Sequence, residues 1–454
     1  MHWEKLLSKK RFEAQTKTHE TDESVRGEFQ RDYDRIVFSS AFRRLQNKTQ
    51  VMPMPESDFV HTRLTHSLEA SCVGRSLGRI VGKSIVERHP ELTQQKNISD
   101  TDFGDAVAAA CLAHDIGNPP FGHSGEDAIS AYFQSPEAAL FLRNLTEAEK
   151  ADLQRFEGNA AGFRILTHTY PAQCDMDGGL RLTYTTLATF TKYPKESVPH
   201  FPGSKLCSEK KYGFFQSEKA RFNTIASELG LLRKSSESSI FFNRHPLAFL
   251  VEAADDICYR VVDFEDGCKL GLIPAAEGVE LLRKLRFELD GKTSTITFTD
   301  WREEIGYLRA RIIGELIEAC AKIFLKEEEG ILAGTFDKAL ISELSCKSTL
   351  DEIKKLSIQK IYKNRPVLEI EAAGFEVLGG LLDAFLKAVF QPNEKRHQKH
   401  LDLIPDQFIG LDRKISSSDY EKIMNITDYI SGLTDQAAIA LFRKIKGISL
   451  PKMY

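Results

Sequence analysis

Residues Ala110 to Glu126 read ACLAHDIGNPPFGHSGE, and the rest of the chain is organised around this stretch. It begins as the end of an apolar helix and breaks at Gly117 to Pro120, because proline cannot continue a helix. Two imidazoles and two carboxylates lie within its last thirteen residues: His114, Asp115, His123 and Glu126. Metal-ligand and acid/base side chains gathered at a broken helix end predict a functional site here.

The composition of the 454 residues is that of an ordinary globular protein, with 42% hydrophobic and 28% charged residues. The formal net charge of -4 does not argue for constitutive nucleic-acid binding, although a local basic pocket stays open. The eight cysteines form no CxxC pair, and we predict buried thiols in a reducing cytoplasm. This pattern favours neither a disulfide framework nor a zinc site.

The N-terminus and the apolar runs argue against export and membrane insertion. MHWEKLLSKKRF at residues 1–12 has no apolar core of signal-peptide length. The longest apolar runs, such as residues 106–113, are too short to span a bilayer. We therefore predict a soluble, cytoplasmic protein with no membrane partner.

Apolar residues recur at helical spacing along most of the chain, so the predicted fold class is all-α. The predicted helices include residues 61–89, 102–115, 183–192 with Thr183 as cap, 246–264, 278–289, 300–325, 378–390 and 418–442. Residues 46–59 and 194–214 are predicted as loops, the second on the surface. Alternation over Val367 to Val377, interrupted by Gly374, predicts a small β-hairpin. A shorter alternation at residues 294–298 is typical of a strand or an extended loop.

Four candidate metal ligands come from three predicted helices: His66, His114, Asp115 and Asp255. Two nitrogens and two oxygens suit a divalent ion such as Mn or Mg, or another transition metal, better than a closed structural zinc site. Asp115 at a helix C-terminus opposes the helix dipole and needs a compensating partner, which a cation would be. Each residue alone also fits a plainer role, such as a hydrogen-bonded histidine on a helix.

His123 and Glu126 are three residues apart and share one face if a helix starts near Ser124. Such a pair can act as a general acid and base beside the metal. The alternative is a helix-start capping pair, and the local sequence leaves both open.

Asp255, Tyr259 and Asp263 recur at every fourth residue and line one polar stripe of an otherwise apolar helix. A buried carboxylate needs a metal, charge or donor partner. An aromatic hydroxyl between two carboxylates suits a sugar, and the alternative is a solvated face. Candidate cations for an anionic substrate are Arg63, on the helix of His66, and Lys192, beside Tyr193. Further candidates are Arg43, Arg44 and Arg164.

Several motifs together resemble those of the HD-domain deoxynucleoside triphosphate triphosphohydrolases, most closely the bacterial dGTPase branch. They are RRLQNKTQV at 43–51, RLTHSLE at 63–69, HDIGNPPFGHSGE at 114–126, EGNAAGFR at 157–164, EAADDICY at 252–259 and DYISGLTD at 428–435. The motifs span nearly the whole chain in the order of that family.

The resemblance implies the all-α HD-domain fold with a helical C-terminal extension, to which we add the small β-hairpin. We expect three regions: residues 1–59, an N-terminal arm and substrate-loop segment; 60–270, the HD catalytic core; and 271–454, a helical region packed on the core and in oligomer contacts. The resemblance also implies hydrolysis of dGTP to the deoxynucleoside and inorganic triphosphate, with other dNTPs left open as substrates. Relatives form hexamers, and some respond to single-stranded DNA or to dNTPs.

The resemblance also implies roles for individual residues. The metal ligands would be His66, His114, Asp115 and Asp255, and the catalytic pair His123 and Glu126. The substrate contacts would be Gln50, Arg63, Asn159, Lys192, Tyr193, and the sugar-recognition pair Tyr259 and Asp263. The family also carries a C-terminal arginine that reaches the nucleotide. Arg396 and Arg413 lie in the corresponding region, but neither aligns clearly with the position of that arginine, so we do not assign it.

Two rival functions stay open at this stage. One is a different HD phosphohydrolase, acting on nucleoside monophosphates or signalling nucleotides. The other is a catalytically silent HD scaffold that senses nucleotide or nucleic acid, although such a scaffold would be expected to have lost part of the ligand set.

Overall fold

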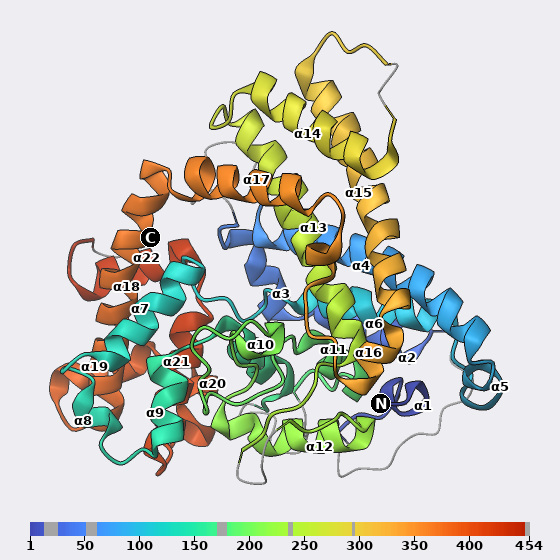
Figure 1. Cartoon of the computed structure of the whole chain (residues 1–454). Helices are drawn as coiled ribbons and strands as arrows, with labels where there is room; N and C mark the ends of the chain where they lie inside the picture. The colour runs from blue at the N-terminus through green and yellow to red at the C-terminus, as the bar shows by residue number, and fades with distance from the viewer. Residues whose placement is uncertain (13–25, 51–60, 170–178, 235–238, 293–295, 450–454) are drawn as a thin grey trace.

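The computed structural model describes residues 1–12, 26–50, 61–169, 179–234, 239–292 and 296–449. These residues are overwhelmingly α-helical (Figure 1). The helices up to residue 167 are α1 (Trp3–Leu6), α2 (Glu28–Val37), α3 (Ser40–Arg44), α4 (Arg63–Arg88), α5 (Glu91–Lys96), α6 (Asp100–Ala113), α7 (His123–Gln134), α8 (Ala139–Leu142), α9 (Glu147–Gln154) and α10 (Gly158–Thr167).

The second half of the chain continues in the same way. Its helices are α11 (Tyr184–Phe190), α12 (Lys219–Leu229), α13 (Pro246–Lys269), α14 (Ala275–Asp290), α15 (Trp301–Lys326), α16 (Glu328–Ala333), α17 (Lys347–Ser357), the π-helical turn η6 (Ile358–Tyr362), α18 (Arg365–Phe390), α19 (Lys395–Leu403), α20 (Asp406–Ile409), α21 (Asp419–Ser431) and α22 (Asp435–Ile445). No helix in the described part of the chain is long and apolar enough to cross a membrane.

Helices α4 and α6 pack unusually closely because α4 presents glycines along one face. A Cβ on Gly78 would lie 2.7 Å from the carbonyl oxygen of Phe103 and 2.8 Å from the Cα of Gly104. Gly74, one turn earlier, would meet the sulfur of Cys111. This close approach brings the N-terminal half of α4 alongside the C-terminal end of α6, where the motif of residues 114–126 begins.

Replacing Gly78 with alanine is expected to destabilise the fold. Alanine favours a helix over glycine by about 1 kcal/mol, but the added methyl would press on backbone atoms, and overpacking costs about 1–3 kcal/mol. Gly314 is the matched control, because a Cβ there meets nothing within 4 Å. Thermal unfolding should show a lower melting temperature for Gly78→Ala and an unchanged or higher one for Gly314→Ala. Equal shifts in the two variants would contradict this reading of the α4–α6 contact.

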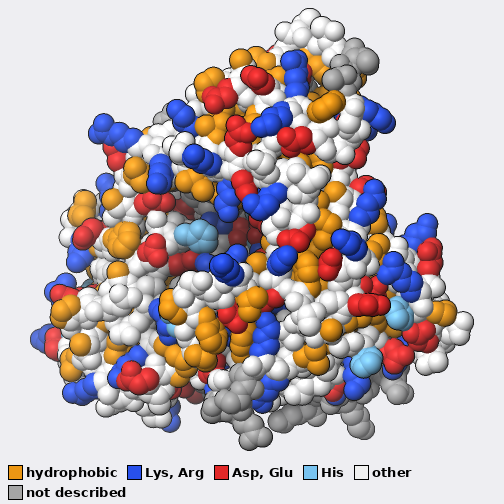
Figure 2. All heavy atoms as spheres, viewed as in Figure 1, with side chains coloured by type: hydrophobic (Ala, Val, Ile, Leu, Met, Phe, Trp, Pro, Cys, Tyr) orange, Lys and Arg blue, Asp and Glu red, His pale blue; other side chains and the backbone are white. Residues whose placement is uncertain are grey.

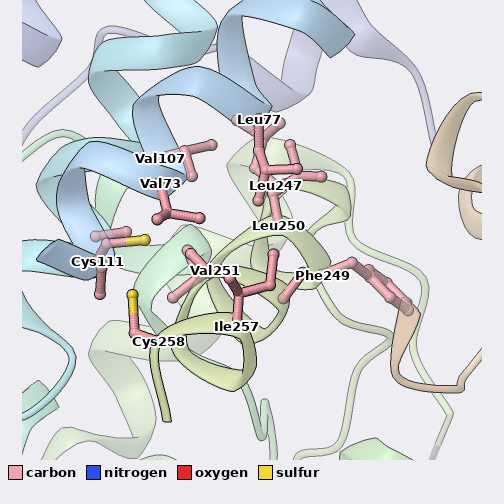
Figure 3. Close-up of a cluster of buried hydrophobic side chains, with 14 of the residues drawn as sticks. Val73, Leu77, Val107, Cys111, Leu247, Phe249, Leu250, Val251, Ile257 and Cys258 are labelled. Carbon is pink, nitrogen blue, oxygen red and sulfur yellow. The ribbon is translucent and has the colours of Figure 1, made fainter. Parts of the chain in front are cut away.

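Helix α13 lies across this pair and completes the main core (Figure 3). The labelled side chains of α4 and α6 are Val73, Leu77, Val107 and Cys111, and those of α13 are Leu247, Phe249, Leu250, Val251, Ile257 and Cys258. Nearly every apolar position of α13 is buried, and three of its polar residues, Asp255, Asp256 and Tyr259, line a cavity beside this core.

A second apolar cluster does not follow the order of the chain. It joins α7, α8 and α9 to α18, α21 and α22, which come more than two hundred residues later. In Figure 1 these helices lie on the opposite side of the molecule from α4, α6 and α15. The turn before α7 therefore sits between the two clusters. The predicted regional boundary at residue 270 stays a prediction.

The predicted β-hairpin over Val367 to Val377 is wrong, because this segment forms the first half of α18. Gly374 is not a hairpin turn. A Cβ there would lie 3.0 Å from the ring of Phe121, so the glycine allows α18 to pack closely on the turn before α7. The described residues contain only isolated β-bridges. Residues 296–298 are not a strand, and 294 and 295 lie outside the described residues.

Three further details differ from the sequence-based expectations. The helix predicted over residues 418–442 is two helices, because the chain turns between Ser431 and Asp435. Cys72 is exposed, whereas the other described cysteines are buried; Cys174 lies outside the described residues, as does most of the predicted loop 46–59. The segment 194–214 is not wholly on the surface, since Lys195 and Glu196 are buried and Glu196 accepts from the amide of Ile240.

Candidate active site

A cavity of about 490 Å³ opens between α4, α6, α13 and the first half of α18. Figure 2 shows that one face of the molecule is hollowed near its centre, where histidine, basic and acidic side chains gather. The cavity lining contains most of the residues singled out in the sequence: Gln50, Arg63, His66, His114, Asp115, His123, Asn159, Lys192, Tyr193, Asp255 and Tyr259. The structure thus brings together residues that are up to 209 positions apart in the chain.

Three of the four predicted metal ligands converge at the base of this cavity. The Nε2 atom of His66 lies 3.2 Å from Oδ1 of Asp255, and Nε2 of His114 lies 3.4 Å from the same oxygen. One ligand atom from each of these residues lies within 4.8 Å of the others. Helices α4, α13 and the residue after α6 each supply one of them.

The hydrogen bonding of His114 shows that this cluster suits a cation. Its Nδ1 donates to the carbonyl oxygen of Cys111 at 2.6 Å, so a neutral ring presents the lone pair of Nε2 to the cluster. That lone pair faces a carboxylate oxygen of Asp255, and two acceptors repel each other unless a proton or a metal ion lies between them. The set of two imidazole nitrogens and one carboxylate oxygen fits a divalent transition metal or Mg.

Lys192 fixes the charge state of Asp255. Burial alone would raise the pKa of this carboxyl, but the Lys192 ammonium at 2.5 Å, together with His114 and His66, holds the pKa of Asp255 well below its usual range. The aspartate is therefore a carboxylate at neutral pH and can serve as an anionic ligand.

Asp115, the fourth predicted ligand, lies beside the three-residue cluster. Its Oδ1 is 3.5 Å from Nε2 of His114 and also accepts from the side-chain amide of Asn118. Its Oδ2 accepts from Nη1 of Arg63 at 2.8 Å. Burial would raise the pKa of Asp115, but Arg63 and the histidines lower it. Arg63 therefore holds Asp115 charged and oriented at the rim of the cluster.

His123 and Glu126 form a hydrogen-bonded pair at the start of α7. Nδ1 of His123 lies 2.9 Å from Oε2 of Glu126, and the other oxygen of Glu126 accepts from the amide of Gly158 at 2.7 Å. The His123 side chain is 78% exposed, whereas Glu126 is buried behind it. Helix α7 begins at His123, so the pair lies in its first turn, and Gly122 at the N-cap has no side chain that could cap the helix.

The turn before His123 has unusual backbone geometry. Phe121 and Gly122 both have positive φ, of 66° and 60°, and a Cβ on Gly122 would lie 2.6 Å from Nη2 of Arg63. Only glycine fits the second position without displacing Arg63. The turn thereby places the Arg63 guanidinium and the His123 ring at one wall of the cavity.

The polar stripe of α13 has a partner that sequence reasoning missed. Tyr259 stacks face to face on Tyr362 of η6, with ring centroids 5.5 Å apart and planes 2° apart. The Tyr362 hydroxyl donates to Asp263 Oδ2 at 2.6 Å. Asp263 is buried and does not line the cavity, and its burial raises its pKa to about 6. The two tyrosines form an aromatic wall in the lining of the cavity, with Tyr259 one helical turn after Asp255.

Other residues were also missed. Lys211 lines the cavity and contacts Glu126 at 3.4 Å and Glu157 at 2.9 Å. It lies in the segment that looked like a surface loop, and Glu157 begins the EGNAAGFR motif in which only Asn159 was assigned. The paired basic residues at 210–211 inside that segment were the available signal.

The remaining basic candidates do not line the cavity: Arg43, Arg44, Arg164, Arg396 and Arg413. Arg164 is buried and pairs with Glu218 and Asp428. Arg413 pairs with Asp406. No C-terminal arginine therefore reaches the cavity within the described part of this chain.

Two family models match the chain. The HD domain model matches residues 63–161, and the model of the phosphohydrolase-associated domain matches residues 342–444. The first covers the helices that supply His66 and His114, and the second covers α17 to α22. His66 and His114, two of the three residues that could hold a metal ion, lie within the residues matched by the HD domain model. The chain is therefore placed in the class of metal-dependent HD phosphohydrolases.

Full-length relatives place the chain more narrowly. A deoxyguanosinetriphosphate triphosphohydrolase-like protein of Synechocystis sp. is 45% identical, over 99% of this chain and 100% of the relative. A protein of the same name from Pseudomonas aeruginosa is 38% identical over the same shares. A deoxyguanosinetriphosphate triphosphohydrolase of Yersinia pestis is 29% identical over 92% of this chain and 93% of the relative. The chain belongs to the family of deoxyguanosinetriphosphate triphosphohydrolase-like proteins.

Proposed function

We propose that this protein is a metal-dependent triphosphohydrolase that cleaves dGTP, and other dNTPs more slowly, to the deoxynucleoside and inorganic triphosphate. The observation that carries the proposal is the placement of His66, His114 and Asp255 beside His123 in one cavity. The names of the relatives support the choice of dGTP, since the Yersinia pestis protein is named for this activity.

The residues at the base of the cavity would hold the metal. His66, His114 and Asp255 would be direct ligands, with Asp115 completing the set or ordering Arg63 beside it. When bound, a divalent ion such as Mn or Mg would neutralise phosphate charge and supply an activated water.

Cationic side chains would bind the triphosphate. Arg63, Lys192 and Lys211 all line the cavity, and Asn159 adds an amide donor. Fixed cations in a partly buried site stabilise charge that develops in a phosphoryl transition state. They are paired with carboxylates in this structure, so the substrate would have to share or displace those partners.

His123 would protonate the leaving group. With Nδ1 bound to Glu126, the ring can direct Nε2 into the cavity. As water attacks the α-phosphorus, the bond from phosphorus to the 5′-oxygen breaks, and His123 would give its proton to that oxygen. Glu126 would keep the ring oriented and stabilise its positive charge.

Sugar recognition would use the aromatic wall. The stacked Tyr259 and Tyr362 present a flat surface that suits deoxyribose and crowds a 2′-hydroxyl. Asp263 would accept from the 3′-hydroxyl if Tyr362 gave up its hydrogen bond. Gln50, which also lines the cavity, would contact the base or the sugar.

Incubation with each dNTP and rNTP in turn, with Mn²⁺ or Mg²⁺, tests this proposal. Chromatography should show deoxynucleoside and tripolyphosphate, fastest with dGTP and slowest with rNTPs. Equal rates on all four dNTPs would sink the dGTP assignment. Pyrophosphate or single phosphate as the product would favour a different HD phosphohydrolase. Tight nucleotide or DNA binding without any turnover would favour a silent scaffold.

The proposal extends to assembly and location. From the family resemblance we propose a cytoplasmic homohexamer whose activity responds to single-stranded DNA or to dNTPs. Light scattering coupled to gel filtration would give the oligomeric state, and rates measured with and without an oligonucleotide would test the effector.

A further inference from the structure

The corner between α21 and α22, residues Ser431 to Asp435, reaches from the C-terminal region to the cavity wall. Thr434 caps α22 by accepting from the amide of Ala437. The next side chain, Asp435, does not take part in this cap and is only 2% exposed. A buried carboxylate needs donors, and those of Asp435 come from two segments more than three hundred residues earlier.

Each oxygen of Asp435 holds one of these segments. Oδ2 accepts from the amide of Thr49 at 3.0 Å and from its hydroxyl at 2.6 Å. Oδ1 accepts from the amide of Phe121 at 3.0 Å. Thr49 lines the cavity and precedes Gln50, whereas Phe121 is two residues before His123. The Asp435 side chain thus connects the segment of Thr49 and Gln50 to the turn that precedes His123, the proposed general acid.

Lys48 makes a parallel connection. Its buried Nζ donates to the carbonyl oxygen of Ser431 at 3.0 Å and to that of Asn118. The carbonyl oxygen of Lys48 accepts from the amide of Arg63, at the start of α4. Residues 48 and 49 are therefore fixed between α4, the turn at 118–122 and the α21–α22 corner.

The turn needs such support because of its backbone. Phe121 is a non-glycine residue with a φ of 66°, a conformation that persists only where the surroundings impose it. The backbone amide of this same residue donates the hydrogen bond to Asp435 Oδ1. Losing the bond would let the turn relax, and the His123 ring would shift relative to the metal-ligand cluster.

We propose that Asp435 is a positioning residue for the reaction, which sets the place of His123 and of the Gln50 segment without touching substrate. This inference rests on the proposed function. The carboxylate is suited to the task because both oxygens accept, whereas an asparagine in the same place would turn an NH₂ group toward one backbone amide.

The test compares Asp435→Asn with Asp428→Asn. Asp428 is a buried carboxylate on α21 that forms an ion pair with Arg164, so its loss should also weaken the fold. This ion pair does not involve residues 48–50 or the turn before His123. Asp435→Asn is expected to lower kcat for dGTP by about 10- to 100-fold, the size expected for misplaced reacting groups. Asp428→Asn should lower the melting temperature but keep kcat. Mn²⁺ affinity, measured by calorimetry, should be unchanged in Asp435→Asn because the ligands lie on other elements.

Hydrogen exchange gives a readout that needs no substrate. Asp435→Asn should speed exchange of the backbone amides of residues 48–50 and 121–123, and Asp428→Asn should not. If Asp435→Asn does not fold, Thr49→Val replaces it, since that variant removes only the hydroxyl bond and should speed exchange at 48–50 alone. A wild-type protein that hydrolyses no dNTP overturns the proposed function. Asp435→Asn that matches Asp428→Asn in exchange and kcat overturns the positioning role.

Discussion

Asp255→Asn is expected to abolish metal-dependent triphosphate release. The Asp255 carboxylate faces His66 and His114 on one oxygen and Lys192 on the other. Asparagine keeps the shape but removes the charge that would bind a divalent cation, and it leaves the Lys192 ammonium without its partner. Without the metal, the transition state would lose several kcal/mol of charge stabilisation. Because about 1.4 kcal/mol corresponds to a tenfold change in rate, kcat should fall by about 10³-fold or more.

Asp256→Asn is the matched control for this experiment. Asp256 is the next residue on α13 and also lines the cavity, but it lies outside the metal-ligand cluster and near Arg260. Calorimetry should show that Mn²⁺ binding is lost in Asp255→Asn and kept in Asp256→Asn. Undiminished Mn²⁺ affinity in Asp255→Asn would mean that the metal is held elsewhere.

The helices were predictable wherever burial follows one face of the chain. Thr183 caps α11 as expected, and the apolar face of α13 is almost continuous. The failed hairpin at 367–377 has a physical cause. On the rim of a cavity, this half of α18 buries Val367, Gly374 and Val377 but leaves Leu368 and Phe375 exposed, so its apolar residues do not follow the helical period. A short alternating sequence does not show which other part of the chain packs on it, so it cannot distinguish a strand from a helix at a cavity rim.

The candidate site was predictable where chemistry and sequence spacing coincide. His114 and Asp115 are adjacent, and Asp255, Tyr259 and Asp263 follow the helical repeat. Tyr362 and Asp435 could not be found in this way, because each acts through a contact between distant segments. Tyr362 is an ordinary aromatic residue until the fold stacks it on Tyr259. Asp435 is an ordinary helix-start acid until Thr49 and Phe121 are brought to it.

His123→Gln is expected to lower kcat by about 10²- to 10⁴-fold, the usual contribution of a positioned general acid. Glutamine cannot carry a transferable proton at this place, and the 5′-oxygen would have to leave unprotonated. The metal-ligand cluster is supplied by α4, α13 and the end of α6, so Mn²⁺ binding should be unchanged. His89→Gln, at a histidine outside the cavity lining, is the control and should keep full activity.

Glu126→Gln separates orientation from proton transfer. Burial would raise the pKa of Glu126, but the hydrogen bond from His123 and the charge of Lys211 lower it, so the residue stays ionised at neutral pH. Glutamine keeps its size and can still accept from Gly158, but it no longer stabilises a positively charged His123. The loss in kcat should be smaller than for His123→Gln, and the double variant should be no slower than His123→Gln alone, because both residues serve one proton transfer. Multiplying losses in the double variant, or near-full tripolyphosphate release by His123→Gln with metal bound, would assign the proton to another group.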